Sequence, residues 1–300
     1  MGDKIFHIRS PHSGHLGSLI PRIFRQCRSE HFGHRKPRFS TWSQPAALAR
    51  CELTFRPRHA IDLDRAVGQH AAYCRMLESL GLDVVRLPGD PAQPDCCFVE
   101  DTAVVLDEVA VLAHPGAPSR RGEVDVVASA LEGYRTLARI PSSARLDGGD
   151  VLALGRRIFV GSSARSDAAG ARALQRIVAP FGYDVVPVGV TGCLHLKSAV
   201  TAIGEGAVLA NPGWLDLAPF DGIDVVPIPA DEPGAANVLH VGGSVIAHSG
   251  FPRTIDLLAA RGVDVRPIDV SEFLKAEAGV TCKSIVFHLV RGSSPGNRPS

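Results

Sequence analysis

Two side chains of this sequence have residue types suited to nucleophilic catalysis. Cys282 lies in Gly279-Val-Thr-Cys-Lys-Ser284 and precedes an apolar run, so we expect it at the mouth of a strand. His195 lies in Leu194-His-Leu-Lys-Ser198. A thiolate attacks electrophilic carbon, and an imidazole can transfer the protons that such a reaction needs. Taken alone, either residue is more often an inert part of a hydrophobic core.

Two acidic stretches could bind a cation beside these groups. They are Pro94-Asp-Cys-Cys-Phe-Val-Glu-Asp101 and Leu146-Asp-Gly-Gly-Asp150. Their acids are Asp95, Glu100, Asp101, Asp147 and Asp150. A planar guanidinium pairs best with two carboxylates, so the acids indicate a guanidine-like ligand. The alternatives are a solvated turn at the first stretch and a simple hairpin at the second.

Two arginines could hold an anionic group of the same ligand. Arg120 lies in Pro118-Ser-Arg-Arg121 and Arg165 in Ser163-Ala-Arg-Ser166, each beyond an expected hairpin and before an expected helix. Together they could clamp a carboxylate. Surface arginines are common, so this pairing is weak without further support.

Internal repetition is the feature that could bring these residues together. An apolar-Asp-Val pattern recurs at spacings of 52, 49, 40 and 40 residues. Its β-branched residues and terminal prolines predict a short strand in each copy. The copies are Leu82–Pro88, the weaker Tyr134–Pro141, Tyr183–Val188, Ile223–Pro229 and Val263–Ile268.

The segments around each copy repeat as well. A helical pattern precedes each strand, and three of the helices end at a glycine that would cap them, Gly81, Gly182 or Gly262. The expected helices are Asp62–Leu80, Glu123–Leu131, Asp167–Pro180, a weak Trp214–Phe220 and Thr254–Ala260. The expected hairpins are 102–106 with 109–113, 151–154 with 157–160, 199–203 with 207–210 and 238–241 with 244–248, followed by 284–289 alone.

Five such units predict an α/β fold closed into a ring. Closure hides the edges of short strands, and residues 46–61, especially Leu53-Thr-Phe55, are expected to supply the strand that closes it. A doubly wound α/β sheet is the alternative. In a ring with pseudo-five-fold symmetry, the loops after the repeated strands surround one axis. Cys282, His195, Asn237 and the two acidic stretches should therefore converge there.

Composition limits the domain organisation. The chain is 45% hydrophobic, which is enough for a substantial core. Residues 1–50 hold nine basic and two acidic residues, so the remaining 250 carry 23 against 29, a net charge of −6. We predict a basic extension over 1–45 without stable structure, one catalytic domain over 46–292, and a flexible tail over 293–300. A targeting segment or a basic arm is the alternative for the extension.

Other counts exclude several classes of protein. The mildly acidic body does not suit nucleic-acid binding. No apolar run approaches the ~20 residues of a membrane span. Seven cysteines without a C-x-x-C pair indicate reduced thiols, hence a cytoplasmic protein without a structural metal. A homodimer is possible.

Over roughly residues 50–290 the chain resembles the dimethylarginine dimethylaminohydrolase (DDAH) family of guanidino-group-modifying enzymes. The resemblance implies a five-bladed β/α propeller, the pentein fold, and a hydrolase without a cofactor. It is carried by the motifs Pro94–Asp101, Pro115-Gly-Ala-Pro-Ser-Arg-Arg121, Leu146–Asp150, Leu194-His-Leu-Lys197, Ala235-Ala-Asn237 and Val280-Thr-Cys282.

The resemblance also implies a reaction. Cys282 would attack the guanidinium carbon of a methylated arginine and form a covalent thiouronium. His195 would protonate the departing amine and then activate water, and Asp147 would orient it. The products would be citrulline and an alkylamine. No metal is required, although Cys282 could contact an inhibitory zinc ion.

The remaining roles implied by the resemblance concern substrate binding. The guanidinium would lie between Asp101 and Asp147. The other expected binding residues are Asp95 for the α-amino group, Arg120 and Arg165 for the α-carboxylate, Glu100 as part of the same motif, and the backbone of Ala276.

One difference from the family leaves the identity of the substrate undecided. Members of the family carry a long loop over the substrate after the first strand, whereas here only Arg56–Ile61 is expected between that strand and the helix. A short lid would leave the site open to water. An arginine deiminase or amidinotransferase of the same superfamily is therefore an alternative. A non-catalytic binding protein on this fold is less favoured, because such a scaffold needs no thiol, imidazole and acids together.

Overall fold

The computed structural model of this chain describes residues 38–41 and 47–289. The chain divides into two units, Met1–Lys36 and Pro37–Ser300, and all described residues belong to the second. Most of the expected extension, 1–37 and 42–45, and the expected tail, 293–300, lie outside the described residues. The described part of the chain contains no helix that is both long and apolar enough to cross a membrane.

Within the described residues, the strands form five small sheets, four of which share one design. Each of the four is an antiparallel hairpin whose second strand pairs in parallel with a third strand. The four sheets are β3 (Ala103–Val105), β4 (Val109–Leu112) and β5 (Thr136–Arg139); β6 (Val151–Leu154), β7 (Arg157–Ser162) and β8 (Asp184–Gly189); β9 (Val200–Gly204), β10 (Ala207–Ala210) and β11 (Asp224–Pro227); and β12 (Leu239–Val241), β13 (Ser244–His248) and β14 (Val265–Ile268). The fifth sheet pairs β1 (Arg38–Thr41) with β2 (Asp83–Arg86) in parallel.

All five copies of the sequence pattern are strands, as predicted. They are β2, β5, β8, β11 and β14, and in each sheet they are the strand that pairs in parallel. A parallel pair needs a crossover, which explains why a helical segment precedes most copies.

The crossover helices also lie close to their predicted positions. They are α1 (Leu63–Ser79), α2 (Glu123–Leu131), α3 (Ala168–Val178) and α5 (Pro252–Ala260). Asp62 and Asp167 cap α1 and α3 by accepting backbone N–H groups. Gly81, Gly182 and Gly262 have φ of 88°, 79° and 79°, the left-handed conformation expected after a helix. The weak helix expected at 214–220 is only a 3-10 turn, η6 (Ala218–Phe220).

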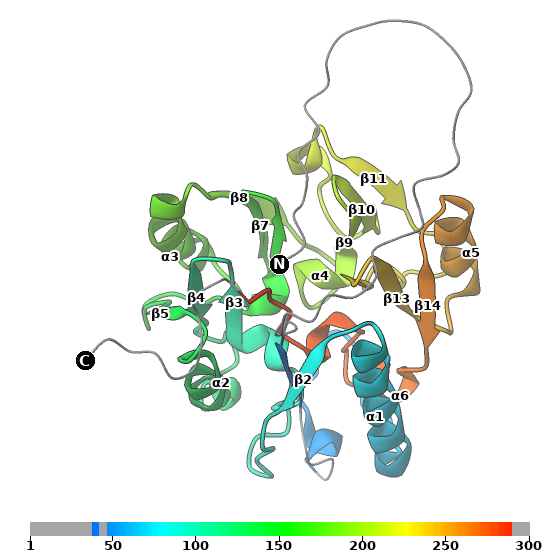
Figure 1. The fold of residues 1–300 in the computed structure, drawn as a ribbon, viewed down its shortest axis with the longest axis horizontal. Coiled ribbons are helices and arrows are strands. Elements are labelled where there is room, and N and C mark those ends of the chain that lie inside the picture. Colours follow the sequence, from blue (N-terminus) through cyan, green and yellow to red (C-terminus); the bar gives the residue numbers. More distant parts are fainter. Residues whose placement is uncertain (1–37, 42–46, 290–300) are drawn as a thin grey trace, which may run out of the picture. The chain divides into compact units, whose positions relative to one another are not determined.

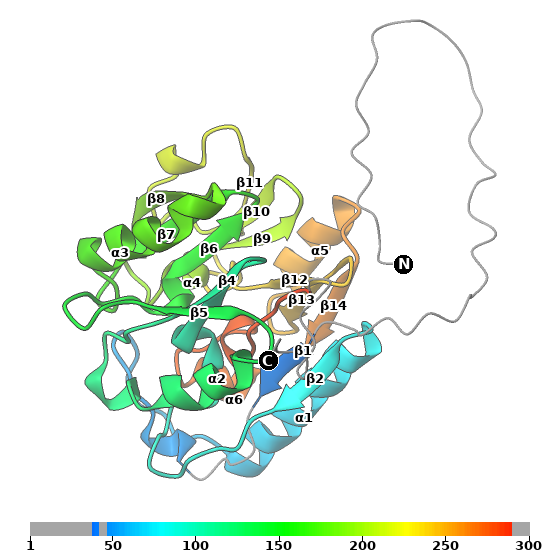
Figure 2. The same ribbon diagram turned by 60° about the vertical axis from the view of Figure 1, so that its left-hand side comes forward.

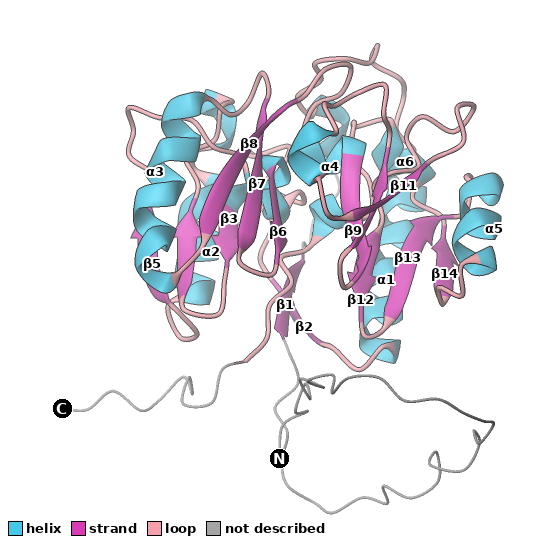
Figure 3. Cartoon of the chain, turned by 90° about the horizontal axis from the view of Figure 1, so that it is seen from above, coloured by secondary structure: helices cyan, strands magenta, loops and turns pink. Residues whose placement is uncertain are grey.

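The sheets follow one another around a common centre in sequence order (Figure 1). Helices α1, α2, α3 and α5 lie outside the sheets in two views (Figures 1 and 2), and Figure 3 shows helices flanking the strands when the view is turned by 90°. A cavity of about 330 Å³ is lined by β3, β6, β9, β12 and residues 284–286. The first strand of each hairpin therefore faces a shared central space.

Two expectations about the closing sheet are wrong. The strand that pairs with β2 is β1, not Leu53-Thr-Phe55, which has no regular structure. Basic and proline residues around 38–41 make this strand difficult to predict from the sequence. It lies before residue 46, where the catalytic domain is expected to begin. The final apolar run, Ser284–Leu289, starts extended at Ser284 but is not a regular strand.

The corrected strand also changes the lid. The loop between β1 and α1 spans residues 42–62, so the segment after the first strand is long. We call its described part, residues 47–62, the lid loop. Leu48 and Cys51 of this loop are buried in a hydrophobic cluster with Phe273, which fixes its beginning.

Candidate functional site

Most of the predicted site residues lie at equivalent ends of the four three-stranded sheets, or at the start of the run 284–289. Short turns before the inner strands carry most of them: η2 (Val99–Thr102) before β3, η4 (Gly148–Asp150) before β6, and α4 (Leu196–Ala199) before β9. Asn237 precedes β12, and η7 (Thr281–Lys283) precedes the run 284–289. Because the inner strands share one central space, these turns meet although their residues are far apart in sequence.

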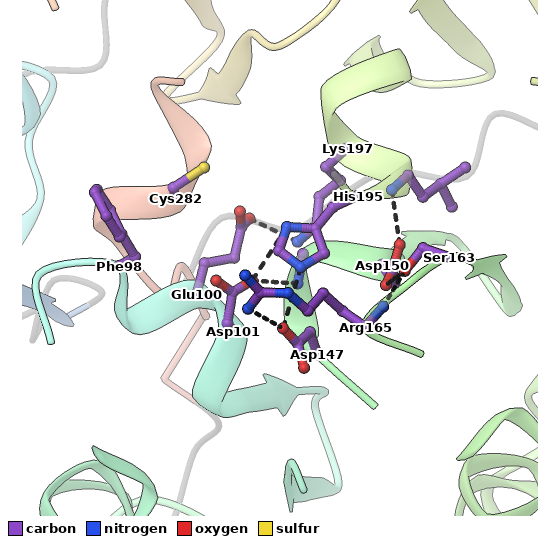
Figure 4. Close-up of polar contacts among 12 residues, drawn as sticks. Phe98, Glu100, Asp101, Asp147, Asp150, Ser163, Arg165, His195, Lys197 and Cys282 are labelled. Atoms are coloured by element: carbon purple, nitrogen blue, oxygen red, sulfur yellow. Dashed lines mark hydrogen bonds and ion pairs between the residues drawn. The ribbon is translucent and has the colours of Figure 1, made fainter. Parts of the chain in front are cut away.

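Asp101, Asp147 and His195 form the centre of the site (Figure 4). All three side chains are buried. His195 Nε2 lies 3.1 Å from Asp147 Oδ2, and His195 Nδ1 lies 3.8 Å from Asp101 Oδ1. The two carboxylates therefore face opposite nitrogens of one imidazole ring.

Gly149 allows this close approach. A Cβ at Gly149 would lie 2.5 Å from Asp101 Oδ1 and 2.8 Å from His195 Nδ1. The Gly149 N–H also donates to Asp101 Oδ1 at 2.9 Å. The Gly-Gly pair thus forms a 3-10 turn at the centre of the site, and the hairpin alternative for this motif does not apply.

Backbone and side-chain donors hold the carboxylates of Asp147 and Asp150 in place. Gly116 N–H donates to Asp147 Oδ1 at 2.7 Å, and Arg165 Nη1 lies 3.8 Å from Asp147 Oδ2. Asp150 accepts from Ser163 Oγ at 2.6 Å and from the Leu196 N–H at 2.8 Å. Because Leu196 follows His195, Asp150 fixes the start of α4 and with it the imidazole.

Arg120 is buried and fully engaged with protein groups. Its Nη1 donates to Asp101 Oδ2 at 2.5 Å, and its Nε and Nη2 donate to Glu123. Nη2 also donates to the Phe98 carbonyl at 2.9 Å. The expected contact of Arg120 with a substrate carboxylate stays a prediction. The sequence reading missed Glu123, which the three-residue spacing on one helix turn could have indicated.

The charge state of His195 follows from its neighbours. Burial by itself lowers the pKa of the imidazole. The carboxylates, first Asp101 and then Asp150 and Asp147, outweigh burial and raise the pKa to about 9. In return, although burial alone would raise it, the pKa of Asp101 is lowered to about 2, mainly by His195 and Arg120. At neutral pH the ring is therefore an imidazolium between carboxylates.

Cys282 is half-buried on η7 and carries a thiol at neutral pH. Burial first, and then the charges of Glu100 and Asp101, raise the pKa of the thiol to about 12. Lys283 and the backbone N–H of Gly279 act in the opposite direction but do not prevail. A thiolate would need an additional cation close by.

Glu100 belongs to the site, and the hydrogen bonds of its carboxylate go to Lys197 and Thr281. Its Oε1 accepts from Lys197 Nζ at 2.6 Å and its Oε2 from Thr281 Oγ1 at 2.7 Å. Glu100, Lys197 and Thr281 also line the central cavity. Direct substrate binding by Glu100 stays a prediction.

The residues expected at an amino-acid end lie beside the lid loop. Asp95 is buried, and its carboxylate accepts the Glu52 N–H at 3.1 and 3.2 Å. Asp95 is close enough to Arg120 and Arg165 for their charges to lower its pKa, although burial leaves that pKa raised. Ala276 is buried in the same hydrophobic cluster as Leu48.

The lid loop is anchored by one carboxylate that the sequence reading missed. Glu277 accepts the N–H groups of Thr54 at 2.9 Å, Phe55 at 2.5 Å and Arg56. It is the only non-glycine residue of the described chain with positive φ, at 56°. The loop forms one wall of a cavity of about 200 Å³ whose other walls include Trp214 and Gly279.

A metal ion is geometrically conceivable at the centre. Ligand atoms of Asp101, Asp147 and His195 lie within 4.8 Å of one another. Metal ligation requires a neutral imidazole, so a bound ion would have to displace the proton that these carboxylates favour on His195. The arrangement suits proton transfer and the binding of a planar organic cation better.

Comparisons with known proteins agree with this chemistry. No protein-family model matches the chain. The N(G),N(G)-dimethylarginine dimethylaminohydrolase of Streptomyces coelicolor is 38% identical over 248 residues, covering 79% of this chain and 92% of that protein. The enzyme of the same name from Pseudomonas aeruginosa is 33% identical over 228 residues, covering 75% of this chain and 90% of its own.

A solved structure is similar as well. It is a DDAH from Pseudomonas aeruginosa, a cysteine-to-serine mutant complexed with citrulline. It is 30% identical, with a TM-score of 0.78, and the match covers 85% of this chain and all of that chain.

Proposed function

The chain belongs to the dimethylarginine dimethylaminohydrolase family, and from this premise we propose that it hydrolyses Nω-methylated arginines to citrulline and methylamine or dimethylamine. The observation that carries the proposal is the buried imidazolium of His195 between Asp101 and Asp147, assembled beside a half-buried thiol. Two carboxylates can hold a guanidinium plane, and the remaining groups supply a nucleophile and a proton.

The family also supports a finer description of the fold. We propose that the five sheets are the blades of a β/α propeller with pseudo-five-fold symmetry, and that residues 46–292 form one catalytic domain to which β1 adds a strand. The repeated hairpin-plus-parallel-strand design and the shared central cavity support this proposal.

The first chemical step forms a bond between Cys282 Sγ and the guanidinium carbon. The free site holds the thiol proton with a pKa of about 12. The bound guanidinium is the cation that favours the thiolate, and the thiol proton leaves to solvent before the sulfur attacks. The tetrahedral adduct then breaks its bond to the methylated nitrogen. His195 gives a proton to that nitrogen, and the alkylamine leaves a covalent thiouronium.

The proton leaves from Nδ1 of His195. Nε2 is held by Asp147 at 3.1 Å, whereas Nδ1 lies 3.8 Å from Asp101 and is the less firmly bound nitrogen. The ring is protonated at neutral pH, which suits it to act first as an acid.

The second step uses the imidazole as a base. After the amine has left, neutral His195 removes a proton from water as the water oxygen bonds to the thiouronium carbon. The carbon–sulfur bond then breaks, and the hydroxyl oxygen gives its remaining proton to the departing sulfur, so that the thiol and citrulline form. His195 ends the cycle protonated, as it began.

The amino-acid end of the substrate is assigned to the groups beside the lid loop. Asp95 would meet the α-ammonium and Arg165 and Arg120 the α-carboxylate, and Ala276 would contribute its backbone. The mutual electrostatic effect of Asp95 and the two arginines supports this grouping. The long lid loop, whose Glu52 N–H contacts Asp95, removes the reason for expecting an open site.

A citrulline assay with asymmetric dimethylarginine, monomethylarginine and arginine side by side tests the proposal. We expect citrulline from the methylated forms. No citrulline from folded protein with any of the three would overturn the enzyme assignment, and fast turnover of arginine alone would move it to the deiminases. Cys282→Ser should bind substrate without turnover, and an active Cys282→Ser would show that the nucleophile is wrong.

We also propose that the protein acts in the cytoplasm and can form a homodimer. The six cysteines of the described residues are free thiols, as a reducing compartment would leave them. The native mass in solution tests the dimer.

A further inference from the structure

The side chain of Asn237 connects the segments that carry the nucleophile and the imidazole. Asn237 is 8% exposed and precedes β12. Its Oδ1 accepts the Thr281 N–H at 3.1 Å, and its Nδ2 donates to Thr281 Oγ1 at 3.0 Å and to the Lys197 carbonyl at 2.8 Å. Thr281 directly precedes Cys282, and Lys197 follows His195 by two residues.

These contacts complete a closed ring of hydrogen bonds under the site. Thr281 Oγ1 donates to Glu100, and Lys197 Nζ donates to the other oxygen of the same carboxylate. Asn237 closes the ring by bonding both Thr281 and the Lys197 backbone. The other three members of the ring are also next to the site in sequence. Glu100 directly precedes Asp101, and Lys197 and Thr281 lie within two residues of His195 and Cys282.

The chain before Cys282 is shaped around the Asn237 amide. A Cβ at Gly279 would lie 2.1 Å from Asn237 Oδ1 and 2.4 Å from its Cγ. Both N–H groups and the oxygen of the amide are thus in use, and the backbone of residues 279–281 packs directly against it. Only an amide can donate twice and accept once in this geometry.

We propose that Asn237 is a positioning residue that fixes Cys282 relative to His195. It touches no reacting atom and acts through the backbones on either side of the thiol and the imidazole. This inference rests on the proposed function, in which sulfur and imidazole act on one carbon. Misplacement by about 1 Å can reduce such a reaction about 100-fold.

The test compares Asn237→Ala with Asn211→Ala. Asn211 has the same exposure, 8%, and its amide also joins two backbone segments, by donating to the Pro233 carbonyl and accepting the Gly213 N–H. We expect Asn237→Ala to lower kcat about 100-fold with KM changed by less than about threefold. Asn211→Ala should change only thermal stability.

Alkylation by iodoacetamide gives a readout that needs no substrate. Peptide mass spectrometry follows each thiol separately. Releasing the segment before Cys282 should expose this half-buried thiol, so its alkylation should become about tenfold faster in Asn237→Ala. Cys74 and Cys97, both fully buried, should react as slowly as in the wild type. The proposal thus predicts that turnover falls while the reactivity of Cys282 alone rises. A general loss of folding stability would instead raise the reactivity of the buried cysteines as well.

Asn237→Asp provides a second variant in case Asn237→Ala does not fold. A protonated carboxyl can donate once, whereas a carboxylate cannot donate. The ratio of variant to wild-type kcat should therefore rise as pH falls through the pKa of the introduced carboxyl.

Three outcomes would overturn the inference. They are a folded Asn237→Ala with kcat within about threefold of the wild type, alkylation that accelerates equally at Cys97 and Cys282, and a pH-independent ratio for Asn237→Asp. If the wild type releases no citrulline at all, the proposed function fails, and the alkylation comparison still decides whether Asn237 positions the thiol.

Discussion

The charge of His195 sets the working pH range of the site. The imidazole is an acid with a pKa of about 9, because Asp101, Asp150 and Asp147 together outweigh the effect of burial. Below that pH the ring can give its proton to a leaving amine, and above it the proton is gone before the reaction starts. At high pH His195 is therefore neutral and cannot act as the acid of the first step.

We predict that kcat/KM falls about tenfold per pH unit above roughly pH 9, because kcat/KM reports the ionisation of the free enzyme. A kcat/KM profile with a methylated arginine over pH 6–11 measures this. In Asp147→Asn one of the carboxylates that raise the pKa of His195 is absent, so the decline should begin at lower pH. A kcat/KM that keeps rising between pH 9 and 10 would contradict the assignment of His195 as the acid.

At the residue scale the sequence predicted the central group well. Asp101, Asp147 and His195 follow from the repeat, because equivalent loop positions in a ring must converge. The partners of these residues could not be predicted. The pairing of Arg120 with Glu123 depends on which way a buried guanidinium turns, and the anchoring by Glu277 depends on a positive φ that no local pattern signals.

At the element scale, one side chain holds three consecutive residues of the lid loop. Glu277 accepts three consecutive N–H groups of the loop, and it does so from the segment that leads to Cys282. Hydrogen bonds to a charged acceptor are worth about 1.5–3 kcal/mol each when removal leaves donors unpaired. The loop and the nucleophile segment are thereby coupled.

We predict that Glu277→Gln loosens the lid loop. One amide oxygen cannot replace two carboxylate oxygens, so trypsin should cleave after Arg58 about tenfold faster than in the wild type. KM should increase while the melting temperature changes little. Limited proteolysis with mass spectrometry measures the cleavage.

Glu232→Gln is the matched control for this prediction. Like Glu277, Glu232 accepts backbone N–H groups, those of Arg253 and Thr254, but it is buried and does so at the start of α5. Its variant should lose stability and leave cleavage after Arg58 unchanged. Equal cleavage in the wild type and Glu277→Gln would show that the loop is held by other contacts.

The elements show which patterns are informative. Five strands were predicted from one repeated pattern, and their helices from 3.6-residue spacing and glycine caps. The strand at 38–41 was missed because it lies in a basic, proline-containing stretch that resembles an extension. That single error also led to the expectation of a short lid, because the segment before α1 follows β1 and not Leu53-Thr-Phe55.

For the molecule as a whole, the N-terminal boundary between the two units can be tested by truncation. Removing residues 1–36 should leave the melting temperature and turnover unchanged, because all described residues belong to the second unit, Pro37–Ser300. Removing residues 1–41 also deletes β1 and exposes an edge of β2, so the melting temperature should fall by about 5 °C or more. Thermal denaturation of the two truncated proteins measures the difference. Equal stability of the two would mean that β1 contributes nothing to the fold.

The hydrogen-bond ring through Glu100, Lys197, Asn237 and Thr281 has a consequence for biosynthesis. Its members come from four different turns, and Thr281 is the last of them to leave the ribosome. Contacts of such long sequence separation form late in folding. A nascent chain can therefore expose acids and imidazole without a positioned nucleophile, and the reactive thiol appears only when the preceding sheets are available to receive it. Regain of activity during refolding should accordingly follow the slowest step of assembly.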